Sequence, residues 1–184
     1  MKYSLPGQID EEQIIYESAV VSQFLCDSFP SHLLPSPSSD PKAALARARI
    51  NFFVDSWSSK LGSQQMGVMK ADASEKEKLV DEWVATVKKE IEPFLSDAGP
   101  FFGGSKELTY TEVIIAPFLV RWYAYSQAGE FVPGSLAEKL DQLPSFGKWA
   151  KAVREHKSVL KIWNGEAFME GFKRKYGKVM VPCK

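Results

Sequence analysis

The stretch that decides the fold is LTYTEV at residues 108–113, which leads directly into a long apolar run. Thr109 has a side chain suited to cap a helix N-terminus, and Glu112, three residues later, can accept a hydrogen bond from the Thr109 N–H. Leu108 can pack on Val113 as a hydrophobic staple across the same turn. The spacing therefore predicts a structural capping box at the start of a buried helix.

Helical patterns extend outward from this motif in both directions. Upstream, Asp40 followed by Pro41 predicts the start of a long helix, and Ser74 with Glu77 predicts a second capping box. Pro117 lies inside the apolar run and predicts a kink in the central helix. Downstream, apolar residues recur at helical spacing through most of the remaining chain. The sequence therefore predicts a mainly α protein.

Near the N-terminus, a short apolar strand runs into a helix through the pair Glu17 and Ser18. Ser18 is the expected N-cap, and the backbone N–H groups behind it can receive a carboxylate. Glu17 can hold an ammonium group, so the pair matches the terminus of an α-amino acid. The competing interpretation is that both residues only cap the helix, because capping alone favours these residue types.

These patterns divide the chain into three segments. Residues 1–30 are expected to form a β-hairpin and one helix, with strands at residues 7–9 and 13–16. Residues 31–40 are rich in proline and serine, which is typical of a linker. Residues 41–184 are expected to form an all-α domain.

The composition is that of an ordinary globular protein, with 45% hydrophobic and 25% charged residues among 184. The 23 basic and 23 acidic residues balance, so neither nucleic acid nor a membrane is expected as a partner. Cys26 and Cys183 lack metal-ligand spacing and fit a reducing compartment, and no metal is expected. The sequence has neither an apolar run of about 20 residues nor a signal-peptide core, and it predicts a cytoplasmic protein.

Three stretches together resemble the glutathione transferase family: Glu17-Ser18, the turn-rich FFGG at residues 101–104 with the capping box that follows, and LPSFGKW at residues 143–149. The sequence is most similar to omega-like and fungal-type members. The resemblance implies the family's all-helical C-terminal domain, a helical bundle, preceded by a remnant of its thioredoxin-like α/β domain. It also implies a homodimer with a role in detoxification. The family's usual acid in this capping box is Asp, so Glu112 is expected to loosen the box.

The resemblance implies glutathione as the co-substrate and assigns residues to it. Glu17 and Ser18 are expected to hold its γ-glutamyl group. Leu5 and Pro6 stand where the family has a Val-Pro pair with a cis proline, and the backbone before that proline pairs with the glutathione cysteine. Leu5, Pro6, Glu17 and Ser18 are therefore the predicted glutathione-binding residues.

A second-substrate pocket for a small electrophile is also implied, between the long helix that begins at Pro41 and the kinked central helix. Its predicted lining residues are Phe53, Trp57, Phe118, Arg121, Trp122 and Tyr125. The competing interpretation is that these aromatic residues belong to the core, as aromatic residues at helical spacing usually do. Arg121 is either ion-paired to an interior carboxylate or placed at the mouth of the pocket.

No residue of the chain is assigned a catalytic role. His32 and His156 have no sequence partner that indicates a triad, and the family's catalytic Tyr, Ser or Cys comes before the Glu-Ser pair, whereas Cys26 follows it. The expectation is a glutathione transferase-like protein that transfers glutathione to small electrophiles or reduces them with it, with activity compromised or absent in this chain. The alternative is a noncatalytic protein-interaction or assembly module derived from a transferase. A truncated gene sequence is a third possibility.

Overall fold

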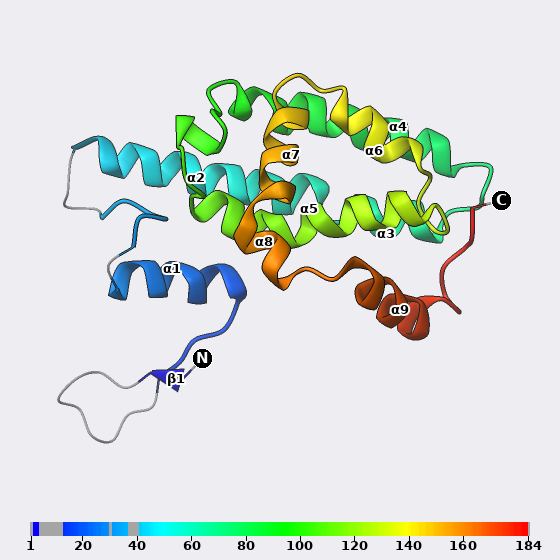
Figure 1. Ribbon diagram of the computed structural model, residues 1–184, viewed down its shortest axis with the longest axis horizontal. Coiled ribbons are helices and arrows are strands. Elements are labelled where there is room, and N and C mark those ends of the chain that lie inside the picture. Colours follow the sequence, from blue (N-terminus) through cyan, green and yellow to red (C-terminus); the bar gives the residue numbers. More distant parts are fainter. Residues whose placement is uncertain (1, 4–12, 30, 37–40, 184) are drawn as a thin grey trace. The chain divides into compact units, whose positions relative to one another are not determined.

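The chain forms two units, residues 1–49 and 50–184, and helices make up most of what is described (Figure 1). The structure is a computed structural model that describes residues 2–3, 13–29, 31–36 and 41–183. The predicted mainly α fold is confirmed. No helix in the described part of the chain combines the length and the hydropathy needed to cross a membrane.

The first unit contains one pair of short strands and one complete helix. Strand β1, Lys2–Tyr3, pairs antiparallel with β2, Gln13–Ile14, so that Lys2 lies opposite Ile14. Helix α1 spans Ser18–Ser28, as predicted. The strand that we expected at residues 7–9 lies outside the described residues, and the strand that pairs with β2 comes from the start of the chain instead.

An arginine clasp stabilises the end of α1 in this unit. Arg47 lies near the start of α2, Pro41–Leu61, and its Nη2 is 2.8 Å from Oδ1 and 3.0 Å from Oδ2 of Asp27. Its Nη1 donates to the carbonyl oxygen of Pro35 at 2.9 Å. Arg47 is buried, so the clasp replaces hydration of the guanidinium with charge-assisted hydrogen bonds. It connects the C-terminal part of α1 to the segment at residues 31–36.

The second unit is a bundle around one central helix, α5, Tyr110–Ala128. Helices α6, α7 and α9 contact α5, and α7 crosses it in Figure 1. Helix α5 begins after its N-cap Thr109 and ends at Gly129. Gly129 has a left-handed conformation, which glycine adopts at a helix C-terminus without a Cβ penalty. The other helical segments are α3 Gln64–Lys70, α4 Lys76–Thr86, a π-helical turn Val87–Ile91, 3₁₀ turns Glu92–Leu95 and Phe102–Gly104, α6 Ser135–Asp141, α7 Phe146–Glu155, α8 Lys157–Ile162 and α9 Gly165–Tyr176.

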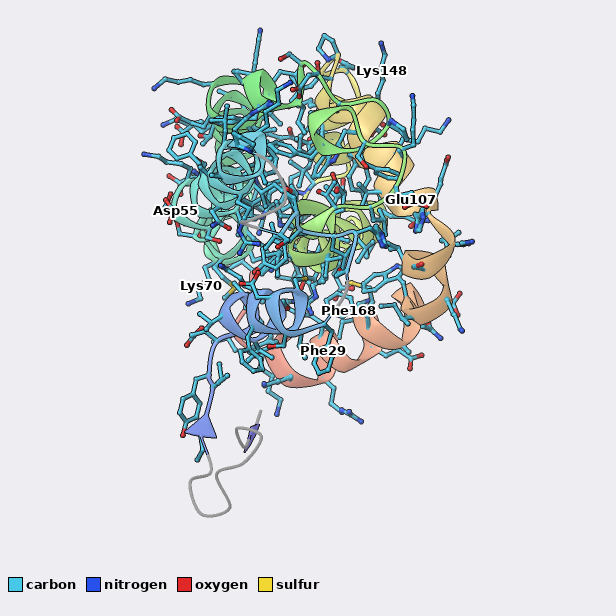
Figure 2. The ribbon with its side chains drawn as sticks, turned by 90° about the vertical axis from the view of Figure 1, so that its left-hand side faces the viewer. Phe29, Asp55, Lys70, Glu107, Lys148 and Phe168 are labelled. Carbon is cyan, nitrogen blue, oxygen red and sulfur yellow. The ribbon has the colours of Figure 1, made fainter. Side chains whose placement is uncertain are left out.

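Tryptophans form much of the core of this bundle. The rings of Trp57 and Trp122 stack at 4.6 Å between centroids and 14° between planes. Trp83 meets Trp122 edge-on at 4.7 Å, and Trp149 meets Trp57 edge-on at 6.2 Å. Offset stacking and edge-to-face contacts are the favoured aromatic geometries. Charged residues such as Asp55 and Lys148 instead lie at the surface (Figure 2), which gives α2 and α7 their amphipathic character.

The second predicted capping box, Ser74 with Glu77, is wrong. Helix α4 begins at Lys76 and its N-cap is Glu75, with no side-chain capping bond. Glu77 accepts hydrogen bonds from the Ser135 hydroxyl at 2.8 and 3.0 Å and pairs with Lys139 at 3.2 Å. These contacts to α6 engage the carboxylate that the box would need.

A buried lysine, which the sequence did not single out, holds three segments of this unit together. Lys76 is 1% exposed, and its Nζ donates to the carbonyl oxygens of Val68 at 2.7 Å, Met69 at 3.3 Å and Phe131 at 2.9 Å. Burial lowers the pKa of Lys76 below its usual value. The two carbonyls from α3 belong to its last turn, where the helix dipole favours a cation.

Candidate functional site

The junction before α1 has an unusual backbone. Glu17 adopts φ 65° and ψ 124°, and it is the one non-glycine residue with positive φ in the described part of the chain. Left-handed φ values are uncommon outside glycine, and such strain costs on the order of 1–3 kcal/mol. Strained backbone of this kind clusters at ligand sites.

The N-cap of α1 is Glu17, not Ser18 as we predicted. The Glu17 carbonyl accepts the first helical hydrogen bond, from the Val21 N–H at 2.9 Å, and Ser18 is already the first helical residue. With this positive φ at Glu17, the helix begins one residue earlier than it would if Ser18 were the N-cap. The Glu17 side chain makes no capping bond, and the side chains of both residues are exposed.

This geometry suits a zwitterionic ligand. The N-terminus of an 11-residue helix carries partial positive charge that favours a carboxylate. The Glu17 carboxylate beside it can receive an ammonium group through a charge-assisted hydrogen bond. The other two predicted glutathione-binding residues, Leu5 and Pro6, lie outside the described residues.

The second unit contains a small cavity between α2 and α5, here called the α2–α5 cavity, with a volume of about 250 Å³. Four of the six residues predicted for the second-substrate pocket line it, namely Trp57, Phe118, Arg121 and Trp122. Its other lining residues are Ser58, Leu61, Gly62, Gln65 and Met66. Gln65 and Met66 come from the short helix α3, whose position beside α5 has no signal in the sequence.

The remaining two predicted pocket residues belong to the core. Phe53 is fully buried and contacts Trp57 and Trp149. Tyr125 is 3% exposed and packs on Phe172 of α9 at 4.8 Å. Burial raises the pKa of Tyr125 to about 12, although the Arg121 charge and a hydrogen bond with Gln65 act in the opposite direction. Phe53 and Tyr125 are therefore core residues, as the competing interpretation of the sequence expected.

Arg121 lies at the edge of the α2–α5 cavity. Its Cζ is 6.0 Å from the ring centroid of Phe118 and 5.6 Å from that of Phe168, which is labelled in Figure 2. It is exposed, and no carboxylate in the described residues forms an ion pair with it. Of the two sequence alternatives, this geometry matches an arginine at the mouth of a pocket.

The capping box at Thr109 and Glu112 forms, and it is part of a larger buried network. Glu112 Oε2 accepts hydrogen bonds from the Thr109 N–H at 2.8 Å and the Thr109 hydroxyl at 2.7 Å. Its Oε1 accepts from the Phe102 N–H at 2.9 Å and the Trp149 indole N–H at 2.7 Å. The expectation that Glu in place of Asp loosens the box is wrong, because the carboxylate uses both oxygens to join α5, α7 and the turn at Phe102.

The predicted staple residues Leu108 and Val113 both line a second cavity, which has a volume of about 320 Å³. This cavity runs between α5 and α8 and is here called the α5–α8 groove. In the described residues no group of three or more His, Cys, Asp or Glu side chains is arranged to hold a metal ion. The role expected for the α2–α5 cavity therefore rests on aromatic, apolar and cationic side chains.

Comparison with known proteins gives the following similarities. Residues 48–141 match the family model described as "Glutathione S-transferase, C-terminal domain". A rice protein, "Probable glutathione S-transferase GSTU1" from Oryza sativa subsp. japonica, is 30% identical over 185 residues, which cover 94% of this chain and 75% of that protein.

Similar solved structures are also glutathione transferases. Rice GST1 in complex with glutathione is 28% identical, with a TM-score of 0.69 over 89% of this chain and 71% of that one. Glutathione transferase Omega 2C from the fungus Trametes versicolor shares the fold at 23% identity, with a TM-score of 0.66 over 91% of this chain and 69% of that one. The expected closeness to omega-like and fungal-type members is not supported, since identity is higher to the rice proteins.

Proposed function

Because this chain belongs to the glutathione S-transferase family, we propose that it binds glutathione at the junction of Glu17 and Ser18. The observation that carries the proposal is the strained backbone of Glu17, φ 65° and ψ 124°, at the N-terminus of α1. The similarity to a rice transferase that binds glutathione supports it.

The chemistry of the junction fits the γ-glutamyl end of glutathione, which carries one ammonium and one carboxylate on the same carbon. In the proposed complex, the Glu17 carboxylate accepts hydrogen bonds from the ammonium group, and the N-terminus of α1 receives the carboxylate. A hydrogen bond to a charged group contributes about 1.5–3 kcal/mol. The loss of the Glu17 charge should therefore weaken glutathione binding by roughly ten-fold or more.

The α2–α5 cavity is the proposed place for a small electrophile. Trp57 and Trp122 contribute apolar lining to it, and the more exposed Phe118 and Arg121 line it as well. A volume of about 250 Å³ lies below the ~300–1,000 Å³ of typical ligand pockets. This size favours a compact electrophile over an extended one.

The proposed reaction class is transfer of glutathione to this electrophile, or its reduction by glutathione. In the transfer, the glutathione sulfur forms a bond to the electrophilic carbon while the thiol proton and the leaving group depart. We further propose that this chain catalyses the step slowly or not at all. The sequence resemblance assigns no residue among its 184 to the catalytic Tyr, Ser or Cys of the family.

A noncatalytic protein-interaction or assembly module is the second candidate function. The observation that favours it is the exposure of α1. None of the residues of this helix is buried, and its apolar residues Val20 and Leu25 are 54% and 39% exposed. Large exposed apolar patches mark protein–protein contacts, and the second candidate function places such a contact on α1. A homodimer would use the same surface. The free thiols of Cys26 and Cys183 fit either function in a reducing compartment, which supports the proposed cytoplasmic location.

A calorimetric titration of the full chain with glutathione tests the proposal. The variant Glu17→Gln removes the charge at nearly constant volume, and Glu138→Gln is the matched control, since Glu138 is an exposed residue of α6. We expect saturable binding that weakens about ten-fold or more in Glu17→Gln and is unchanged in Glu138→Gln. No binding by the unaltered chain would leave the interaction module as the better account.

The same samples then go into a conjugation assay with an activated aryl chloride. Binding without turnover supports a glutathione-binding protein that lacks its own catalytic residue. Binding with rapid turnover would contradict the slow-catalysis part of the proposal and leave the glutathione site intact. The two readouts therefore separate binding from catalysis.

A further inference from the structure

The charges of this chain are unevenly distributed along its length. Residues 144–184 contain ten basic and three acidic residues, whereas residues 1–143 contain thirteen basic and twenty acidic residues. The balance over the whole chain, which on its own predicts no membrane partner, therefore conceals a strongly basic C-terminal part. Such a charge asymmetry is typical of proteins that bind nucleic acid or an anionic membrane surface.

Helices α7 and α8 form the first part of this basic stretch, and they contact one another. All the lysines of the two helices are exposed, namely Lys148, Lys151, Lys157 and Lys161, and Figure 2 shows Lys148 at the outer surface. Glu155 is the one acidic residue in the sequence of the two helices, and it lies 3.9 Å from Lys151. Within the described residues no carboxylate forms an ion pair with the other three lysines. These helices therefore present positive charge that the protein itself leaves largely uncompensated.

Helix α8 combines two of these lysines with two large apolar side chains. Val159 is buried, so Lys157 and Lys161, two residues before and after it, lie on the outer face of the helix. Leu160 and Ile162 flank this face on opposite sides, and they are 56% and 86% exposed.

This mixture of side chains distinguishes between the possible anionic partners. Singly exposed apolar residues are normal on protein surfaces, but here two of them border a pair of unpaired lysines on one helix. The phosphates of a nucleic acid would bind the lysines and leave Leu160 and Ile162 in water. A membrane interface accommodates both kinds of side chain, because its phosphate groups lie next to the acyl chains. The combination therefore favours a membrane that contains anionic lipid.

We propose that the outer face of α8 docks on a membrane surface that contains anionic phospholipid. Lys157 and Lys161 contact the lipid phosphates, and Leu160 and Ile162 enter the boundary between the headgroups and the acyl chains. The lysines of α7 add to the attraction. The docking is peripheral, and it does not depend on glutathione binding at Glu17. Each lysine that approaches an anionic surface strengthens the binding roughly five-fold.

The test is co-sedimentation of the full chain with phosphatidylcholine vesicles, either pure or containing about 30% phosphatidylserine, in the absence of glutathione. We expect binding to the anionic vesicles that is stronger by roughly ten-fold or more than binding to the neutral ones. This binding should be lost in ~1 M sodium chloride, where the Debye length falls to about 3 Å. Equal binding to both kinds of vesicle, or binding to neither, would overturn the proposal.

A charge variant locates the surface on α8. Lys157→Gln combined with Lys161→Gln removes both lysines of the outer face and should weaken binding to the anionic vesicles by roughly 25-fold. The matched control is Lys60→Gln combined with Lys88→Gln, since these two lysines are also exposed and lie in α2 and in the π-helical turn. Equal weakening in the two double variants would show that only the total charge matters, and it would overturn the assignment to α8.

An apolar variant separates a membrane from a nucleic acid. Ile162→Ser should weaken binding to the anionic vesicles by roughly ten-fold, because the inserted isoleucine side chain is lost. Leu45→Ser is the matched control, since Leu45 is 64% exposed on α2, and it should bind as the unaltered chain does. Unchanged vesicle affinity in Ile162→Ser, or tighter binding of the unaltered chain to duplex DNA than to the anionic vesicles, would overturn the proposal. Circular dichroism of each variant confirms that the fold is kept.

Discussion

The indole N–H of Trp149 donates to Oε1 of Glu112 at 2.7 Å, and both side chains are almost completely buried. The two residues are 37 positions apart in the sequence. The bond connects the capping box of α5 to the first turns of α7, and Trp149 in turn packs against Trp57 of α2. Three helices of the second unit therefore depend on one buried carboxylate.

We predict that Glu112→Gln lowers the free energy of unfolding by about 2–4 kcal/mol. The amide NH₂ has no lone pair, so it cannot accept hydrogen bonds from donors that point at the carboxylate, and at least one buried N–H is left without a partner. Urea denaturation measures the change, with Glu138→Gln as an exposed control.

A double-mutant cycle with Trp149→Phe isolates the single bond. We expect a coupling free energy of about 1.5–3 kcal/mol between positions 112 and 149, as for other hydrogen bonds to a charged group. Additive effects within about 0.5 kcal/mol would show that the network does not act through this contact.

The buried Tyr125 makes stability depend on alkaline pH. Its pKa is raised from 10.0 to about 12, so the folded state holds the proton more tightly than the unfolded state does. This contribution is fully present below pH 10 and is lost as the pH rises toward 12. We therefore expect Tyr125→Phe to flatten the fall of the melting temperature between pH 10 and 12, measured by scanning calorimetry. The same slope in Tyr125→Phe and in the control Tyr16→Phe would contradict this assignment.

The strained backbone of Glu17 predicts a trade-off between stability and binding. Glycine adopts φ 65° without a Cβ penalty, so Glu17→Gly should stabilise the chain by about 1 kcal/mol. The same change removes the carboxylate and should weaken glutathione binding. Thermal unfolding and calorimetry on one sample measure both effects. A variant that is both less stable and unaltered in binding would contradict the proposed role of this backbone.

We predict that the chain self-associates. The two-stranded sheet of β1 and β2 is below the size that is stable alone, and α1 has no buried residue. Sedimentation velocity over a concentration series should show a second, faster species, and Val20→Glu on α1 should reduce it. A single monomeric species at every concentration would contradict self-association.

Local spacing in the sequence identified the elements but not the contacts between them. Thr109 with Glu112 and Ser74 with Glu77 have the same spacing, yet only the first pair forms a capping box. The difference is tertiary, because Ser135 and Lys139 of α6 engage Glu77. In the same way, Glu112 accepts hydrogen bonds from Phe102 and Trp149. These two residues lie in the stretches 101–104 and 143–149, which the sequence analysis identified separately. Nothing in local spacing connects them.

The candidate site shows the same limit. The sequence identified the Glu17–Ser18 junction from residue types, but the positive φ that places the N-cap on Glu17 is a backbone property that residue types do not encode. For the α2–α5 cavity, helical spacing placed Phe53 and Tyr125 with Trp57 and Arg121, because aromatic residues in a core and in a pocket have the same period. Burial does not separate them either, since Trp57 and Trp122 line the cavity and are as deeply buried as Tyr125. The tertiary packing decides, because Phe53 faces Trp149 and Tyr125 faces Phe172, and neither lines the cavity.

The most direct test of the glutathione site is an NMR titration of the ¹⁵N-labelled chain with glutathione. The account predicts saturable shifts of the backbone amides of Ser18, Ala19 and Val20, the first turn of α1, and their loss in Glu17→Gln. Saturable shifts confined to other residues, or none at millimolar glutathione, would contradict the assignment of the γ-glutamyl site to this junction.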